Sequence, residues 1–128
     1  MTDVVLIADD DMDIVRFVAL NLRLEGFEVV VASDGQDALD KARDVQPSLI
    51  LLDTMMPRMD GYEVCSRFRD QRPDAAIPVI MLTAKSLDAD RAMAFTAGAD
   101  DWVTKPFDPA DLVSKVKDHL RAQAAAVG

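Results

Sequence analysis

Five short runs of apolar residues, rich in β-branched side chains, alternate along this chain with longer segments of mixed polarity. The runs read VVLIA, EVVVA, SLILL, PVIML and WVT, at residues 4–8, 28–32, 48–52, 78–82 and 102–104. All but the last are nearly continuous rather than alternating, which is typical of strands covered on both faces. This feature constrains the fold most, because such strands require helices on both sides of their sheet.

The segments between the runs have the periodicity of amphipathic helices, in which apolar residues recur along one face. The predicted helices cover residues 12–24, 36–45, 61–70, 87–97 and 109–122. In the fourth of them we expect Ala92 and Phe95 to form the apolar face.

Residue types that are favoured at helix ends lie close to these boundaries. The candidate end residues are the capping-box pairs Ser33–Gln36 and Asp60–Glu63, the N-cap Asp108 before Pro109, and the C-terminal glycines Gly26 and Gly98. The order of five strands, each followed by a helix, predicts an α/β protein with an open parallel sheet and right-handed crossovers. Five such units are too few for the eight-unit barrel.

The chain has 128 residues, which points to one domain. We expect this domain to span residues 1–122, with the Ala-rich residues 123–128 forming a frayed helix end or the start of a linker. No apolar run is long enough to cross a membrane, and the N-terminus lacks the basic region of a signal peptide. These features favour a cytoplasmic location.

Composition excludes several classes of site. The single cysteine, Cys65, allows no intrachain disulfide, and with the single histidine, His119, it makes softer metals less suitable. The net charge of −9 would repel a phosphate backbone, so we expect no direct binding of nucleic acid.

Polar residues of specific kinds follow the predicted strands. They are Asp9, Asp10 and Asp11 after the first run, Ser33 and Asp34 after the second, Asp53 after the third, Thr83 and Ala84 after the fourth, and Lys105 and Pro106 after the fifth. In doubly wound sheets the functional site lies beyond the carboxyl ends of the strands. We therefore expect these side chains to meet at one edge of the sheet.

Several carboxylates at one edge repel each other unless a cation offsets their charge. Mg²⁺ suits them best, because it is held by a few carboxylates, water and phosphate oxygens. Asp53 could then act as a nucleophile and form an aspartyl-phosphate. Lys105 would neutralise phosphate charge, and the Thr83 hydroxyl would donate to a phosphate oxygen.

The segments VLIADDDMDI, LILLDTMMPRMDGYEV, PVIMLTAKS and GADDWVTKPF together resemble the receiver domain of two-component response regulators. The resemblance extends from about Val4 to about Leu120. It implies the flavodoxin-like (βα)₅ three-layer sandwich, with strand order 2-1-3-4-5. It also implies transfer of a phosphoryl group to Asp53 from a sensor histidine kinase or a phosphotransfer protein.

The same resemblance assigns roles to individual residues. Mg²⁺, with Mn²⁺ as an alternative metal, would be held by Asp10, Asp53, the Met55 backbone carbonyl and, through water, Asp9. Phosphate would contact Thr83, Lys105 and the Ala84 backbone, with a cis peptide bond between Lys105 and Pro106. Thr83 and Trp102 would form the switch, although a tryptophan is larger than the usual aromatic residue there. The output face would be helix four, strand five and helix five, through which the regulator could form a homodimer.

Other interpretations of these residues are open. Asp9, Asp11 and Asp13 imitate an EF-hand, but Ile14 and Leu20 stand where that loop needs glycine and glutamate. The same acids resemble the nucleophile loop of haloacid-dehalogenase-like phosphatases, which is the minor alternative, with Asp9 as nucleophile. The acids could also be a solvated acidic loop or a helix N-terminus enriched in acids.

Single residues have structural interpretations as well. Lys105 could be a surface lysine, Thr83 a helix cap and Trp102 a core residue. The charges of the last helix and of residues 88–101 could be a solvated face rather than a dimer interface. The cognate kinase and the output are not specified, nor is whether the domain stands alone.

Overall fold

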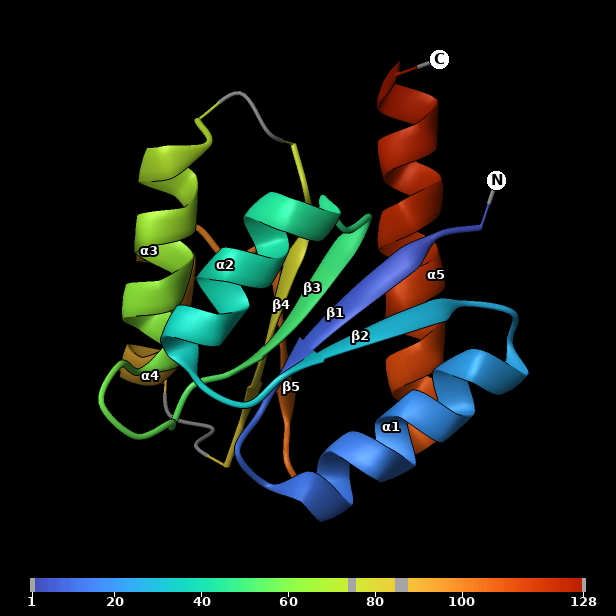
Figure 1. Ribbon diagram of the computed structural model, residues 1–128, viewed down its shortest axis with the longest axis horizontal. Helices are drawn as coiled ribbons and strands as arrows, with labels where there is room; N and C mark the ends of the chain where they lie inside the picture. The colour runs from blue at the N-terminus through green and yellow to red at the C-terminus, as the bar shows by residue number, and fades with distance from the viewer. Residues whose placement is uncertain (1, 74–75, 85–87, 128) are drawn as a thin grey trace.

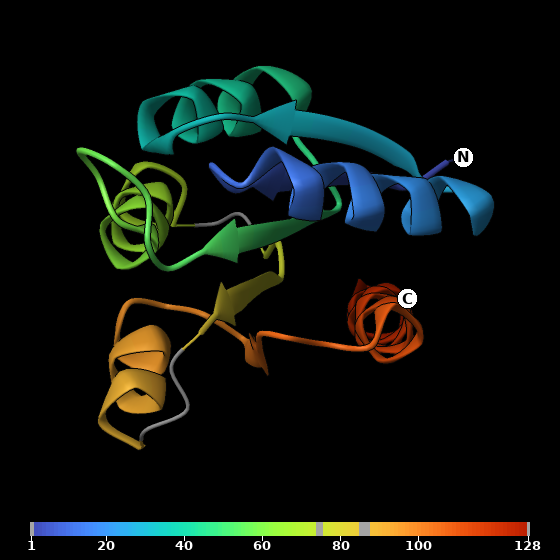
Figure 2. The same ribbon diagram turned by 90° about the horizontal axis from the view of Figure 1, so that it is seen from below.

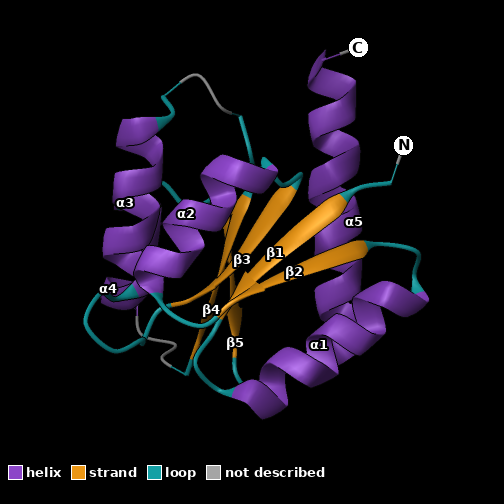
Figure 3. Cartoon of the chain, viewed as in Figure 1, coloured by secondary structure: helices purple, strands orange, loops and turns teal. Residues whose placement is uncertain are grey.

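The computed structural model describes residues 2–73, 76–84 and 88–127. Its five strands form one parallel sheet in the order β2-β1-β3-β4-β5, as predicted. They are β1 (Val4–Ala8), β2 (Glu28–Ala32), β3 (Leu49–Asp53), β4 (Val79–Thr83) and β5 (Asp101–Thr104). β3 lies at the centre of the sheet, between β1 and β4 (Figure 3).

Five helices cover the sheet. They are α1 (Met12–Leu24), α2 (Gly35–Val45), α3 (Gly61–Gln71), α4 (Asp88–Thr96) and α5 (Pro109–Val127). Helices α1 and α5 lie on one face, and α2, α3 and α4 lie on the other (Figure 1). Figure 2 shows the strands between these two helix layers. The predicted flavodoxin-like three-layer fold is therefore confirmed.

Alternate residues of each strand pack into two separate hydrophobic cores, because successive side chains of a strand point to opposite faces of the sheet. On the α1 and α5 side, Ile7 and Leu51 are buried with Val116. On the other side, Leu6 and Leu52 are buried against α2 and α3, where the only cysteine, Cys65, is 1% exposed. Burial raises the pKa of the Cys65 thiol to about 11. The continuous apolar runs of the sequence thus serve both layers.

The ends of three helices, α1, α3 and α4, match the residues expected there. Gly26 and Gly98 have φ angles of 92° and 106°, a left-handed conformation that glycine adopts without steric cost. The Asp60 carboxylate accepts a hydrogen bond of 2.9 Å from the Glu63 amide at the start of α3.

The cap predicted for α2 is wrong by one residue. Asp34, not Ser33, is the N-cap, and its carboxylate accepts a hydrogen bond of 2.8 Å from the Asp37 amide. The Ser33 amide instead donates to Asp37 Oδ2 at 3.1 Å. Serine and aspartate are both good N-caps, so the sequence did not distinguish two adjacent candidates.

The predicted apolar face of α4 is also wrong. Ala94 is 0% exposed and packs on the sheet, whereas Phe95 is 46% exposed. Ala92 is exposed as well. The helix is only nine residues long, and its apolar residues 92–95 are consecutive, so its periodicity did not fix its orientation.

Helix α5 continues through Val127, beyond the predicted end at residue 122. Among the described residues, no helix has both the length and the apolar character needed to span a membrane.

Candidate functional site

The carboxyl ends of β1, β3 and β5 bring three charged side chains together. Asp53 is the last residue of β3, Asp9 follows β1 directly, and Lys105 follows β5 directly. Lys105 Nζ lies 2.9 Å from Asp9 Oδ2 and 3.3 Å from Asp53 Oδ1. The three residues are far apart in the sequence, and only the parallel topology places their side chains at the same edge.

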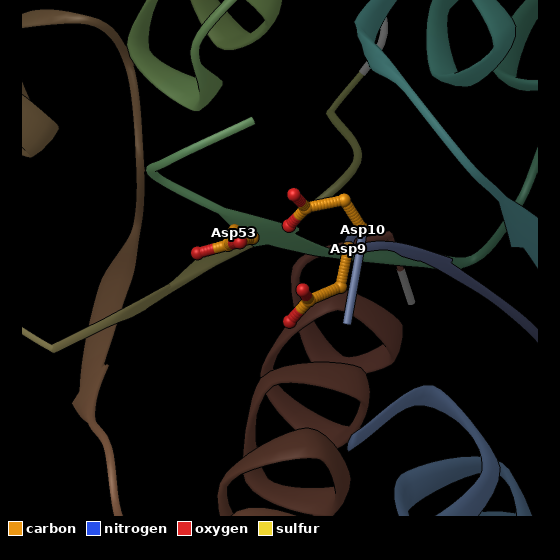
Figure 4. A group of neighbouring side chains, drawn as sticks. All are labelled: Asp9, Asp10 and Asp53. Atoms are coloured by element: carbon orange, nitrogen blue, oxygen red, sulfur yellow. The ribbon is translucent and has the colours of Figure 1, made fainter. Parts of the chain in front are cut away.

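Asp10 completes a group of three carboxylates. One carboxylate oxygen from each of Asp9, Asp10 and Asp53 lies within 4.8 Å of the others. Figure 4 shows the three side chains gathered beside the end of β3. Asp9 is 0% exposed and Asp53 is 5% exposed, whereas Asp10 faces solvent. A donor set of oxygens alone, open to water on one side, fits a hard cation such as Mg²⁺.

Backbone amides orient two of these carboxylates. The Asp11 amide donates to Asp9 Oδ1 at 2.9 Å, and the Met55 amide donates to Asp53 Oδ1 at 3.3 Å. Asp11 itself caps α1 by accepting from the Asp13 and Ile14 amides. Asp11 is thus a helix cap outside the carboxylate group.

The proximity of these charges changes their proton affinities. Burial and the neighbouring charge of Asp9 raise the pKa of Asp53 to about 6, although Lys105 acts in the opposite direction. Burial disfavours the charge of Lys105, but the hydrogen bond and charge of Asp9, together with Asp53, outweigh it and raise the pKa of the lysine. In the absence of a cation, the site therefore has one carboxylate that gains a proton readily.

Thr83 and Ala84 border the same edge. Thr83 ends β4, is fully buried, and its carbonyl accepts a hydrogen bond of 2.6 Å from the Lys105 amide. Asp53 pairs with Leu82 in the register of β3 and β4, so Thr83 lies one residue beyond Asp53 along the neighbouring strand. Ala84 follows and is exposed. The peptide bond between Lys105 and Pro106 is cis.

Trp102 lies inward, on the α3 and α4 side of the sheet, and is 6% exposed. Its indole Nε1 donates to Thr104 Oγ1 at 3.0 Å, and the Arg91 guanidinium lies 5.9 Å from the ring centroid. The indole ring of Trp102 is therefore buried, although it is larger than the usual aromatic side chain at this position. Sequence reasoning missed Thr104, although its spacing of two residues along a strand places it on the same face as Trp102.

Sequence reasoning also missed a polar cluster around Asp101. Its carboxylate lies 3.2 Å from Lys115 Nζ and 2.8 Å from His119 Nε2, and it accepts from the Trp102 amide at 2.7 Å. Burial opposes the charge, but these hydrogen bonds together lower the pKa of Asp101. Lys115 and Asp101 were candidates for contacts between protomers, and here they pair within one chain.

The family model for the response regulator receiver domain matches residues 5–117. The chain is 42% identical over 126 residues to the alkaline phosphatase synthesis transcriptional regulatory protein PhoP of Bacillus subtilis, covering 98% of this chain and 52% of that protein. It is also 42% identical over 117 residues to the DNA-binding response regulator MtrA of Mycobacterium tuberculosis, covering 91% of this chain and 50% of MtrA. The chain thus spans about half the length of these curated relatives.

Solved structures show the same fold over whole chains. A CheY-like response regulator receiver domain protein from Methanospirillum hungatei superposes with a TM-score of 0.92 at 31% identity, covering 98% of this chain and 99% of that one. The chemotaxis protein CheY4 of Vibrio cholerae gives a TM-score of 0.87 at 32% identity, covering 92% of this chain and 98% of that one.

Proposed function

Because this chain belongs to the response regulator receiver domain family, we propose that it is a phosphorylation-activated switch that accepts a phosphoryl group on Asp53. The observation that carries the proposal is the bridging position of Lys105, 2.9 Å from Asp9 and 3.3 Å from Asp53. Asp53 lies at the end of the central strand, where acids that follow the neighbouring β1 and a lysine that follows β5 converge. A receiver domain is a signalling switch rather than a conventional enzyme, so the phosphatase alternative is withdrawn.

In the proposed reaction, a carboxylate oxygen of Asp53 attacks the phosphorus of a phosphohistidine. A P–O bond forms as the P–N bond breaks, and the electron pair returns to the imidazole nitrogen of the donor. The donor is a sensor histidine kinase or a phosphotransfer protein. Lys105, the Thr83 hydroxyl and the Ala84 amide then contact oxygens of the bound phosphoryl group.

The carboxylate group fits the Mg²⁺ that such chemistry requires. We propose Asp10, Asp53 and the Met55 carbonyl as direct ligands and Asp9 as a ligand through water, with Mn²⁺ as an alternative metal. Bound metal would offset negative charge on the phosphoryl oxygens. The protein residues do the positioning: the amides of Asp11 and Met55 orient two carboxylates, and Lys105 bridges Asp9 and Asp53.

The proposed output is a change on the face formed by α4, β5 and α5. Thr83 stands beside the phosphoacceptor, and Trp102 belongs to the strand that pairs with β4. Phosphate on Asp53 would bind the Thr83 hydroxyl and shift the balance between two arrangements of this face. The same face is the proposed surface for a homodimer or an output partner.

We place this switch in the cytoplasm, and we assign no DNA binding to these residues because their net charge is −9. The MtrA relatives are named as DNA-binding regulators and are about twice as long as the matched region. DNA binding in a regulator of that kind would therefore belong to its other half.

The experiment is incubation of the protein with Mg²⁺ and acetyl phosphate, followed by peptide mass spectrometry to locate base-labile phosphate. We expect label on Asp53 and none in Asp53→Asn. Asp60→Asn, which alters an acid in the next loop, is the matched control and should keep the label. Phosphate on Asp9, or undiminished label in Asp53→Asn, would contradict the proposal.

A further inference from the structure

Gly61, the first residue of α3, lies directly against the backbone of the phosphoacceptor. A Cβ at this position would stand 2.9 Å from the Asp53 carbonyl carbon and 2.9 Å from the Thr54 Cα, and closer still to the Asp53 carbonyl oxygen. All three are main-chain atoms of a central strand end, which cannot rotate away as a flexible side chain can. Only glycine therefore allows this approach.

The contact is held by hydrogen bonds on both sides of the glycine. The Gly61 amide donates to the Thr54 carbonyl at 3.0 Å. Asp60 caps the helix by accepting from the Glu63 amide at 2.9 Å. The hydrogen bond fixes the start of α3 to the Thr54–Met55 peptide group, while Gly61 packs against the preceding peptide group, which joins Asp53 to Thr54.

Gly35, at the start of α2, provides a second close approach to the loop between β3 and α3. Its added Cβ would meet Val64 Cγ2 at 2.8 Å and Met59 Cβ at 2.9 Å. The two closest atoms belong to side chains, and neither residue belongs to the carboxylate group. The two glycines therefore offer similar crowding at different distances from Asp53.

We propose that Gly61 is a positioning residue for phosphoryl transfer, because it seats the first turn of α3 on the Asp53–Thr54 peptide. Asp9 and Lys105 are held by other strands, so a displaced Asp53 peptide would move its carboxylate relative to both. The next peptide group, between Thr54 and Met55, accepts the Gly61 hydrogen bond through its carbonyl and orients the Asp53 carboxylate through its amide. This inference rests on the proposed function of Asp53 as phosphoacceptor.

The test compares Gly61→Ala with Gly35→Ala in the full chain. Three quantities are measured: the free energy of unfolding, the Mg²⁺ dissociation constant from Trp102 fluorescence, and the rate of phosphorylation by acetyl phosphate at saturating Mg²⁺. Both variants should lose stability. In its folded population, Gly61→Ala should bind Mg²⁺ at least 10-fold more weakly and react about 100-fold more slowly, as expected for misplaced reacting groups. Gly35→Ala should stay within about twofold of wild type in both, since its crowding falls on Val64 and Met59 rather than on the backbone of Asp53 and Thr54.

If Gly61→Ala does not fold, a second pair of variants carries the test. Asp60→Ala removes the charge and the cap of α3, whereas Asp60→Asn removes the same charge and keeps a good cap. We expect Mg²⁺ binding and phosphorylation to be several-fold weaker in Asp60→Ala than in Asp60→Asn.

The outcomes separate this inference from the function it rests on. Wild-type protein that takes no phosphate on Asp53 would overturn both. Normal wild-type phosphorylation with a folded Gly61→Ala that binds and reacts like Gly35→Ala would overturn the role of Gly61 alone. Equal behaviour of the two Asp60 variants would do the same when Gly61→Ala is unfolded.

Discussion

Lys105 and Asp9 form a buried ion pair, with Nζ 2.9 Å from Oδ2 and side chains that are 16% and 0% exposed. The pair joins the end of β5 to the end of β1, which are separated in the sheet by β3 and β4. The Lys105 side chain extends past the ends of these strands, and its Nζ also forms an ion pair with Asp53 at the end of β3. The lysine therefore offsets two carboxylates that have no other cation within 4 Å among the described residues.

Replacement of Lys105 by methionine should destabilise the metal-free protein. It leaves Asp9 and Asp53 buried without their cation, and loss of one partner of a buried pair costs about 3 kcal/mol or more. Urea unfolding at pH 7.5 measures the loss, which should shrink at pH 5 as Asp53 gains a proton. Lys117→Met is the control, because it removes a more exposed pair with Glu25 and should cost less than about 1 kcal/mol. Equal losses in the two variants would contradict the bridging role.

The raised pKa of Asp53 predicts a specific pH dependence without metal. Its pKa rises from 3.8 to about 6 on folding, so the native state holds a proton that the unfolded chain has released between these values. Stability from this group is therefore fully present below pH 4 and is lost as pH rises through about 6, a change of about 3 kcal/mol.

Asp53→Asn should abolish this contribution. The difference in unfolding free energy between the variant and wild type should grow from pH 4 to pH 6.5 and then level off. Asp40→Asn, which alters a partly exposed acid, should show no growth over that range. A constant difference for Asp53→Asn would show that the carboxylate ionises normally. The same proton competes with metal, so Mg²⁺ affinity should fall as pH drops below about 6.

Thr104→Val should loosen the Trp102 ring. The substitution removes the acceptor of the indole N–H, and an unsatisfied buried donor costs about 1–3 kcal/mol. Trp102 is the single tryptophan, so its emission should shift to the red if the ring moves toward water. Thr96→Val, at an exposed position of α4, should leave the spectrum unchanged. An unshifted spectrum and unchanged stability in Thr104→Val would show that packing alone holds the ring.

Arg69→Met should weaken the links from α3 to the segments that precede β4 and β5. The guanidinium donates to the carbonyls of Gly98 and Ile77 and to Asp100 Oδ2, at 2.8–3.0 Å. Loss of these bonds should cost about 2–3 kcal/mol in urea unfolding. Arg67→Met, which removes a more exposed pair with Glu63, is the matched control and should cost less than about 1 kcal/mol. Similar costs for the two would contradict a structural role for the Arg69 bonds.

The fold and the residues at the strand ends could be predicted because both follow from the order of elements along the chain. Asp53 and Lys105 are many residues apart, yet a parallel sheet with all helices crossing in one hand brings their strand ends to one edge. Features that depend on three-dimensional packing were less accessible. The orientation of α4 depends on which of its consecutive apolar residues reaches the sheet, and Ala94 is small enough to pack closely there.

The sequence also could not specify which polar side chains pair with one another. In the sequence, Asp101 was one of several charged residues that could form an ion pair across a dimer interface or face solvent. The distances to Lys115 and His119 come from the way α5 packs beside β5, which the sequence pattern does not encode. The role of Gly61 was hidden for the same reason, since a glycine at a helix start looks like any other until its neighbour is known.

Cys65 lies on the buried face of α3, so the reactivity of its thiol reports local opening of this helix. A thiol that is 1% exposed and whose pKa is about 11 reacts with an alkylating reagent only when the helix lifts from the sheet. The first residue of that helix also seats the peptide of Asp53. The rate of thiol labelling would therefore measure how often α3 separates from the backbone of the phosphoacceptor.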